Sequence, residues 1–545
     1  MIANSIRLLL LLLLVDTVKA QEASTANSKS ERTVVFVSDL HMGVGRNPER
    51  PSEWDVTEDF RWHAEFESFL DAINRQGQQR VDLVLIGDIL ELWQSLPGDS
   101  TCEYGDDRGC SEEEAIHRAC RVIDQHMQVF HSLRDFVGPE RDNFITIVPG
   151  NHDAALVYPS VGELVLAAIP TESPSRVRMA VGGYWRSTDG KVIAEHGQQI
   201  GKDPNRFDGW PLEPFLTVDG KRYLQQTWGE NFVQGLFNRY EREYPVIDNL
   251  SSETLGVSYA TKHLGWMGTT KELGSMVRFL VFEQSWAQAT QGLPVTDGEK
   301  PKWKIDDINL DSSEARWRFL AQSLDINDPI AEAANNSLRS LPDLTELTRD
   351  EIEDACDKRW SMHLADPSRG VELCPHGGGL SAATQSLVAG LTPRVRAAAF
   401  RERLNQLRSD VQEEGSGAEN IFQTYVYGHT HFEHNACTPF SRQADWKPLV
   451  VNDGAWQRTA NEEILCALLA GKEEDTDAFA KLKPEDLPGC YPFVIIAPGQ
   501  PALLRYWVQA DAASKGTIKA FCTDTPTIPK QCKRKQTNAC PAHPG

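Results

Sequence analysis

Short apolar runs that end in polar residues recur along the first 200 residues of the chain. The runs from Thr33 to Ser38 and from Val81 to Gly87 are continuous, as strands buried on both faces are. Two more such runs end at Gly150 and Gly197. Helical patterns separate the runs, so the chain is predicted to be an α/β protein with buried strands.

Capping signals predict the helices between these strands. Thr57 is a suitable N-cap for a helix that runs to about Gln76. Ser111 and Glu114 form a capping-box pattern, which predicts a long amphipathic helix ending near Gly138. His117, His126 and His131 of that helix are expected on a solvated face.

After about residue 200 the alternation of strand and helix patterns stops, and strand patterns return after about residue 420. The segment up to about 420 is rich in Trp, Arg, Glu and Asp with helical spacing, and it contains one clear helix that begins at Pro393. Strand patterns follow over Thr424–Tyr427, Leu449–Asn452, Phe493–Ala497 and Leu503–Val508. The predicted organisation is a core in two parts, 21–200 and 421–511, a mainly helical insertion or cap over 201–420, and a cysteine-containing extension over 512–545.

Residues 1–20 are typical of a signal peptide. Arg7 precedes an apolar run from Leu8 to Val15, and small residues precede a cleavage site near Ala20. The run is much shorter than the roughly 20 residues that span a bilayer. The mature chain is therefore expected to be secreted or periplasmic, without a transmembrane segment.

The charge of the chain limits its partners. The net charge is −23, and removal of Arg7, Lys19 and Asp16 with the signal peptide makes the chain still more acidic. Such a surface repels long polyanions, so a stable nucleic-acid partner is not expected. A local site for a small phosphorylated compound remains compatible with this charge.

All eleven cysteines follow the predicted signal peptide. In an exported protein they are expected to form disulfides, and the odd count leaves at least one free or intermolecular. Close spacing suggests the pairs Cys102–Cys110, Cys356–Cys374 and Cys522–Cys532.

Carboxylates, imidazoles and an asparagine, which are residue types suited to metal binding and catalysis, follow five of the predicted strands. They are Asp39 and His41; Asp88; Asn151, His152 and Asp153; His196; and His429 and His431. The ends of parallel strands meet at one edge of a sheet, where ligands bind. A pair of metal ions needs a bridging carboxylate with several N and O ligands, and this set favours Mn, Fe or Zn.

Each of these residues also has a simpler interpretation when it is taken alone. Asp39 and Asp88 are of a type that caps helices after strands. Asn151 after a glycine suits a turn. The ordered set favours the metal interpretation over these, and His434 is expected to lie outside the ligands.

The ordered motifs Asp-x-His, Gly-Asp, Gly-Asn-His-Asp, His and Gly-His-Thr-His resemble those of the calcineurin-like metallophosphoesterase superfamily. The resemblance covers about 33–200 and 420–510, and "SDLHMG" with "GDILELW" is closest to the branch that contains UDP-diacylglucosamine pyrophosphatases. It implies a four-layer sandwich of two mixed β-sheets flanked by helices. It also implies two metal ions bridged by Asp88, one bound by Asp39, His41 and His431 and the other by Asn151, His196 and His429.

The family chemistry implies a metal-activated hydroxide that attacks phosphorus in line. His152 would stabilise the transition state or protonate the leaving oxygen, and Asp153 would orient His152. The expected function is an exported, metal-dependent phosphoric ester hydrolase. The alternatives are a phosphodiesterase or a nucleotide or UDP-sugar-type pyrophosphatase, and, in a different class, a secreted metal-containing binding protein without turnover.

Overall fold

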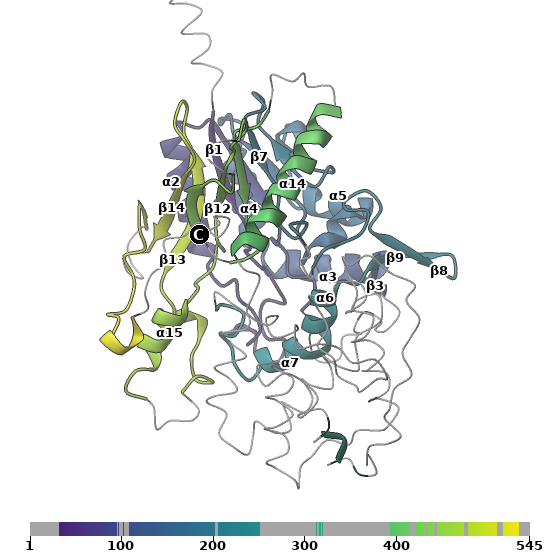
Figure 1. The fold of residues 1–545 in the computed structure, drawn as a ribbon, viewed down its shortest axis with the longest axis vertical. Helices are drawn as coiled ribbons and strands as arrows, with labels where there is room; N and C mark the ends of the chain where they lie inside the picture. Colours follow the sequence, from purple (N-terminus) through teal and green to yellow (C-terminus); the bar gives the residue numbers. More distant parts are fainter. Residues whose placement is uncertain are drawn as a thin grey trace, which may run out of the picture.

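The computed structural model of the protein describes residues 32–94, 96, 102, 108–201, 205–250, 312, 315–317, 319, 352, 393–413, 421–431, 433–440, 444–472, 478–509 and 516–533 (Figure 1). These residues form a mixed α/β fold with three sheets. The predicted signal peptide and most of the predicted insertion lie outside the described residues. No helix in the described part of the chain is long and apolar enough to cross a bilayer.

The largest sheet has seven strands in the order β15-β14-β13-β1-β2-β4-β5. Its parallel strands are β1 (Thr33–Val37), β2 (Val81–Ile86), β4 (Phe144–Val148) and β5 (Val177–Met179). Its antiparallel strands are β13 (Cys490–Ile496), β14 (Leu503–Val508) and β15 (Thr517–Lys519). The two distant parts of the predicted core therefore join where β13 pairs with β1.

A second sheet has five strands in the order β11-β12-β10-β7-β6. The central strands β7 (Val192–Ala194), β10 (Thr424–Tyr427) and β12 (Leu449–Asn452) are parallel. The edge strands β6 (Trp185–Arg186) and β11 (His434–Cys437) are antiparallel. A small antiparallel sheet contains β3 (Arg108–Ser111), β9 (Lys221–Gln225) and β8 (Phe215–Val218).

The two larger sheets share a core because side chains alternate between the faces of each strand. In β1, Phe36 points into a buried cluster that also contains Val426 of β10 and Val451 of β12. Its neighbours Val35 and Val37 belong to a different cluster, on the opposite face of the sheet. Both faces of β1 are thus covered, which explains its continuous apolar sequence.

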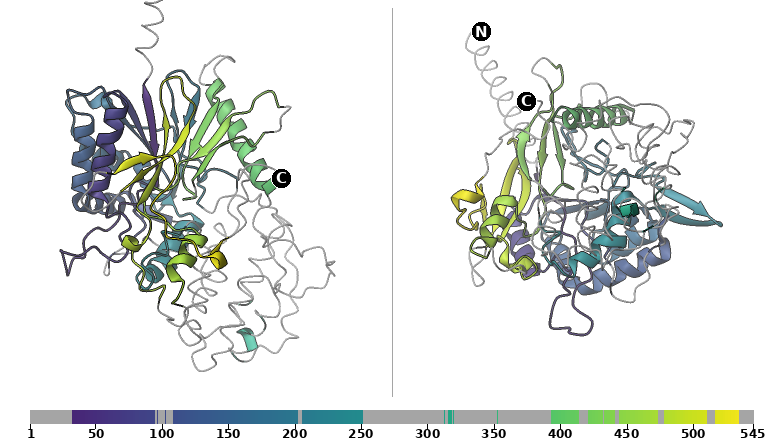
Figure 2. Two further views of the ribbon diagram at one scale, coloured as in Figure 1. Left: turned by 90° about the vertical axis from the view of Figure 1, so that its left-hand side faces the viewer. Right: turned by 60° about the horizontal axis from the view of Figure 1, so that its bottom comes forward.

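Helices cover the outer faces of both sheets, as Figure 2 shows. The seven-stranded sheet packs against α2 (His63–Gln76), α3 (Glu112–Gln125), α4 (Met127–Phe136) and α5 (Pro159–Ala167). The five-stranded sheet packs against α14 (Pro393–Glu413) through Phe400, Leu404, Leu407 and Val411. The other helices of the described residues are α6 (Trp228–Phe232), α7 (Asn238–Glu241) and α15 (Glu462–Leu469). A π-helical segment lies over Val233–Phe237, and short 3₁₀ turns lie over Ala154–Val157, Pro174–Arg176, Pro484–Asp486 and Lys530–Cys532.

A buried ion pair holds α14 to the sheet. The guanidinium of Arg403 donates to both oxygens of Glu195, at 2.8 and 2.5 Å. The hydroxyl of Tyr425 donates to the same carboxylate at 2.8 Å. Because Glu195 directly follows β7, this contact fixes the end of the strand that carries His196.

Two helix predictions are wrong in detail. The first helix begins at His63, not after Thr57, because Thr57 instead donates to Asp55 in a buried turn. The helix that Ser111 and Glu114 cap is confirmed at its start. It ends at Gln125, and α4 begins after His126.

His126 is fully buried, so its predicted place on a solvated face is also wrong. Its Nδ1 lies 2.9 Å from Nε2 of His63, and its Nε2 lies 3.3 Å from Glu58. Glu58 in turn accepts a hydrogen bond from the backbone N–H of Gly45 at 2.6 Å. His126, at the break between α3 and α4, thus supports the loop that follows β1 through its contact with Glu58.

Three disulfides lie within the described residues. The predicted pair Cys102–Cys110 is confirmed. The predicted pair Cys522–Cys532 is wrong, because Cys522 pairs with Cys490 and Cys532 pairs with Cys466. Cys120 is free, and the predicted pair Cys356–Cys374 lies outside the described residues.

The stability of the protein is expected to depend on Glu230 of α6. Burial raises the pKa of Glu230 to about 8, although the charge of Arg118 opposes this. In the unfolded chain the pKa is near 4.5. The folded state therefore keeps a proton that the unfolded state releases, and stability falls as the pH rises from about 4.5 to about 8.

Glu230→Gln replaces this proton-dependent group with a neutral amide. The melting temperature of the variant should fall less than that of the wild type between about pH 5 and pH 9, with a difference on the order of 5 °C. Thermal unfolding across this pH range measures the effect. Parallel pH profiles for the two proteins would contradict the assignment.

Candidate metal centre

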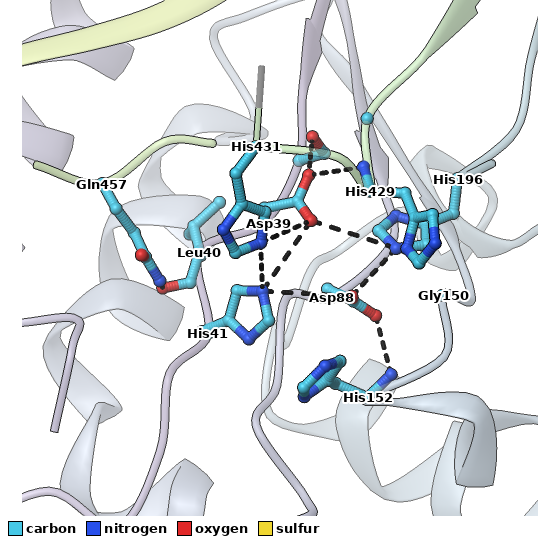
Figure 3. A network of polar contacts seen from close by, with 12 residues as sticks. Asp39, Leu40, His41, Asp88, Gly150, His152, His196, His429, His431 and Gln457 are labelled. Carbon is cyan, nitrogen blue, oxygen red and sulfur yellow. Dashed lines mark hydrogen bonds and ion pairs between the residues drawn. The ribbon is translucent and has the colours of Figure 1, made fainter. Parts of the chain in front are cut away.

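The predicted ligands lie at the carboxyl ends of parallel strands from both large sheets. Asp39 and His41 follow β1, Asp88 follows β2, Asn151 follows β4, His196 follows β7, and His429 and His431 follow β10. Figure 3 shows many of these side chains pointing toward a common centre. The strand ends thus bring together residues that are up to about 390 positions apart in the sequence.

Asp39, His41 and His431 form the first group of ligating atoms. Oδ1 of Asp39 lies 3.7 Å from Nε2 of His41 and 3.4 Å from Nε2 of His431. The two Nε2 atoms lie 3.2 Å apart. A tetrahedral ion with bonds of about 2.0–2.1 Å holds its ligands roughly 3.3 Å apart, so this spacing suits a transition metal.

Asp88, His196 and His429 form the second group. Nδ1 of His196 donates to the carbonyl of Ile86 at 2.9 Å, which directs Nε2 toward the centre. That Nε2 lies 2.8 Å from Oδ2 of Asp88. The ring of His429 packs against the ring of His196, with 5.1 Å between their centroids.

Asp88 lies between the two groups. Its Oδ2 is 2.8 Å from His196 and 3.9 Å from Nε2 of His41. Its Oδ1 accepts the backbone N–H of His152 at 2.8 Å. Asp88 is therefore within reach of both groups of ligating atoms.

Several buried atoms of the centre have no hydrogen-bond partner among the described residues. Among these residues, Oδ1 of Asn151 has none at all, whereas Oδ1 of Asp39 and Nε2 of His196 meet other ligating groups only as ion pairs. Buried polar atoms are normally satisfied, because leaving one unpaired costs about 1–3 kcal/mol. Oxygen and imidazole nitrogen atoms in this state fit the donor set of a metal ion.

Backbone conformation also marks the centre. Eight non-glycine residues of the described chain have positive φ angles. Five of them are predicted ligands: Asp39 (53°), His41 (49°), Asp88 (51°), His429 (68°) and His431 (53°). This conformation costs an L-residue about 1–2 kcal/mol, and its clustering at one place is typical of a functional site.

Two glycines allow the strand ends to approach closely. A Cβ on Gly150 would lie 2.2 Å from Oδ1 of Asp88. A Cβ on Gly428 would lie 2.1 Å from Oγ of Ser38 and 2.5 Å from Oδ2 of Asp39. These contacts explain the glycines of the Gly-Asn-His-Asp and Gly-His-Thr-His motifs.

The electrostatics of the centre favour positive charge. Burial raises the pKa of Asp39, but His196 and the contacts with His41 and His431 outweigh burial and hold it well below its usual value. Burial lowers the pKa of His196, but Asp88 and Asp39 raise it to about 10. Positive charge is what a metal cation brings to such a site.

Glu91 orients the imidazole of His152, and the prediction that Asp153 does so is wrong. Oε2 of Glu91 contacts Nδ1 of His152 and lies 2.9 Å from Nδ1 of His41. Burial raises the pKa of Glu91, but His152 and His41 outweigh burial and lower it to about 2, so the carboxylate stays ionised. Trp93 packs over His152, with 3.9 Å between ring centroids.

Asp153 has a structural contact instead. Its oxygens accept the backbone N–H groups of Gly150 at 2.6 Å and Ile89 at 2.8 Å. It thus ties the loop after β4 to the loop after β2. The alternative role of Asp39 and Asp88 as helix N-caps is also wrong, because described loop residues follow each of them.

His152, His429 and His431 are the partly exposed side chains of the centre. The side chains of His152 and His431 keep 17% and 20% of their surface exposed. Those of Asp39, Asp88 and His196 keep 2% or less.

Four contributing residues were absent from the sequence predictions. Glu91 stands three positions after Asp88, within the stretch "GDILELW", but no role was predicted for it. Asn452 donates to the carbonyl of Gly428 at 2.9 Å and so supports the turn with the last histidines. Asp453 lies 2.9 Å from Oγ of Ser38, which also contacts Asp39.

His434 lies outside both groups of ligating atoms, as predicted. Its Nε2 is 2.9 Å from the hydroxyl of Tyr427.

Comparison with models of known protein families finds no match, and no curated protein matches the chain.

Glu91→Gln is expected to lower metal affinity by about 10-fold to 100-fold, because a neutral amide orients His41 and His152 less strongly. Metal titration measures the effect. Glu163→Gln makes the same change at an exposed position on α5 and serves as the control. Unchanged metal affinity in Glu91→Gln would contradict the orienting role.

Proposed function

We propose that the protein is an exported phosphoesterase of the calcineurin-like metallophosphoesterase type, acting with two metal ions. The observation that carries the proposal is the pair of ligand groups around Asp88, beside a partly exposed His152. Nitrogen and oxygen ligands in these numbers favour Mn, Fe or Zn.

In this proposal Asp39, His41 and His431 hold one ion, and Asn151, His196 and His429 hold the other. Asp88 is shared between them. When bound, the ions would supply Lewis-acid charge to the phosphoryl oxygens and lower the pKa of water. The substrate is a small phosphorylated compound.

His152 carries the proton in the proposed reaction. Glu91 contacts Nδ1 of His152, so Nε2 is the ring nitrogen that would face the substrate. An imidazole held this way can donate a proton to the leaving oxygen or stabilise the charge on it. Trp93 and the backbone contact with Asp88 limit its movement, which favours a fixed reactive geometry.

The wider architecture follows the same proposal. We assign a four-layer sandwich, supported by the shared core of the two sheets and by helices on their outer faces. The predicted insertion or cap over 201–420 lies mostly outside the described residues and stays a prediction. Residues 1–20 act as a signal peptide, and the disulfides favour an oxidising compartment, either periplasmic or extracellular.

A substrate panel with and without metal tests the proposal. Purified protein is treated with a chelator and then supplied with Mn²⁺, Fe²⁺ or Zn²⁺. Each sample is assayed with aryl phosphomonoesters, phosphodiesters and nucleoside diphosphate sugars. Metal-dependent hydrolysis of a monoester supports the proposal. Hydrolysis of only diesters or pyrophosphates supports the alternative phosphodiesterase or pyrophosphatase, and metal binding without turnover supports a binding protein.

A further inference from the structure

A second group of carboxylates lies outside the metal centre. Asp59, Glu241 and Asp248, named here the acidic cluster, each bring one oxygen within 4.8 Å of the others. They come from three separate segments: the loop before α2, the end of α7, and the turn after α7. The cluster contains no imidazole or thiolate.

The acidic cluster is largely buried. Glu241 is 0% exposed and Asp59 is 3% exposed. Oε1 of Glu241 accepts a hydrogen bond from Gln94 at 3.1 Å. Its Oε2 is buried without a hydrogen-bond partner among the described residues, so it is the oxygen left to meet an ion. An unpaired carboxylate in this position is costly unless positive charge compensates it.

Two arginines lie near the acidic cluster. Arg61 donates to the carbonyl oxygens of Glu58 and Asp55, and pairs with Glu485 at 3.0 Å. Arg242 pairs with Asp55 at 3.4 Å. Their charges lower the pKa values of Asp59 and Glu241, but burial and the neighbouring carboxylates outweigh them.

Burial disfavours the ionised form of at least two carboxyl groups of the acidic cluster. Burial, opposed by His41 and reinforced by Glu58, raises the pKa of Asp59 to about 7. Burial and the charges of Asp248 and Asp59 raise the pKa of Glu241 well above its usual value. Burial therefore favours the protonated forms of Asp59 and Glu241, and a bound cation would favour their ionised forms.

We propose that Asp59, Glu241 and Asp248 bind a calcium ion. Carboxylate oxygens without nitrogen or sulfur ligands suit a hard cation. Ca²⁺ accepts an irregular set of oxygens and completes its shell with backbone carbonyls and water, whereas Mg²⁺ demands near-octahedral geometry. The ion is distinct from the transition metals of the main centre.

The position of the cluster gives the ion a structural consequence. Gln94, which binds Glu241, also donates its backbone N–H to Glu91 at 3.2 Å. Asn238 of α7 donates to the carbonyl of Trp93 at 2.9 Å. Calcium at the cluster thus joins α7 and its following turn to the segment that supports His152.

Thermal unfolding with calcium tests the site. The full chain is dialysed against a calcium chelator, and Ca²⁺ alone is added at about 100 times its dissociation constant. The melting temperature of the wild type should rise by about 3 °C. The rise should persist in Asp88→Asn, which alters the main centre, and in the surface control Glu163→Gln. It should be absent in Glu241→Gln, and Mg²⁺ should produce a smaller rise in the wild type.

Two results would overturn the proposal. One is the absence of a calcium-dependent rise in the wild type, which means that protons alone neutralise the cluster. The other is an equal rise in Glu241→Gln, which places the calcium elsewhere. If Glu241→Gln does not fold, Asp248→Asn at the half-buried position replaces it, and bound calcium after gel filtration should fall by one ion per chain.

Discussion

Asp88→Asn is expected to lower the hydrolysis of 4-nitrophenyl phosphate by at least about 1,000-fold. Loss of the shared carboxylate charge removes several kcal/mol of transition-state stabilisation, and each 1.36 kcal/mol is a factor of ten in rate. The amide also binds metal more weakly than the carboxylate. Bound metal per chain should therefore fall together with the rate.

Asp82→Asn is the matched control for this substitution. Asp82 lies on the same strand, β2, but near its start, where it pairs with Arg32 at 2.6 Å. The control should keep its metal and its activity. Normal turnover in Asp88→Asn would exclude the shared role of Asp88, whatever its metal content.

His152→Ala is expected to keep both metals and to lose about 100-fold or more in rate. The expectation follows from the structure, because Asp88 contacts only the backbone N–H of His152 and the imidazole lies against Glu91 and Trp93. The loss should be larger for phenyl phosphate than for 4-nitrophenyl phosphate, because the poorer leaving group needs the proton more.

His117→Ala makes the same change at an exposed position on α3 and should leave the rate unchanged. Steady-state kinetics with both esters and metal analysis of each variant provide the comparison. Loss of metal in His152→Ala would make His152 a ligand. An equal loss of rate with both esters would instead favour charge stabilisation over proton donation.

The sequence located the candidate ligands at strand ends because each is marked locally. Every predicted ligand follows an apolar run, and the runs form parallel strands whose ends meet. The strand Leu503–Val508 has the predicted bounds, and the helix from Pro393 begins where expected. Strong periodicity and a proline at the first helical position are signals that tertiary contacts rarely override.

The orientation of side chains could not be predicted in the same way. Asp153 is adjacent to His152 in sequence, but its carboxylate points to the backbone of the neighbouring loop. Glu91 reaches His152 only because the loops after β2 and β4 lie side by side, with the N–H of Leu92 donating to the carbonyl of His152 at 3.3 Å. Such contacts depend on the packing of strands that are distant in sequence.

The same reasoning explains the errors in helices and disulfides. Thr57 is a good N-cap by type, but the buried contacts of Glu58 use this segment to support the loop after β1. Cys522 and Cys532 are close in sequence, yet each lies beside a cysteine from another element. The spacing of cysteines in the sequence shows which pairs are possible, but it does not show which of them form.

The metal content of the purified wild-type protein tests the central claim most directly. Two ligand groups around Asp88 predict about two transition-metal ions per chain after incubation with Mn²⁺, Fe²⁺ or Zn²⁺ and gel filtration, measured by elemental analysis. Hydrolysis of an aryl phosphate should rise with occupancy. Less than one bound ion per chain under all three conditions, or hydrolysis that does not depend on occupancy, would contradict the account.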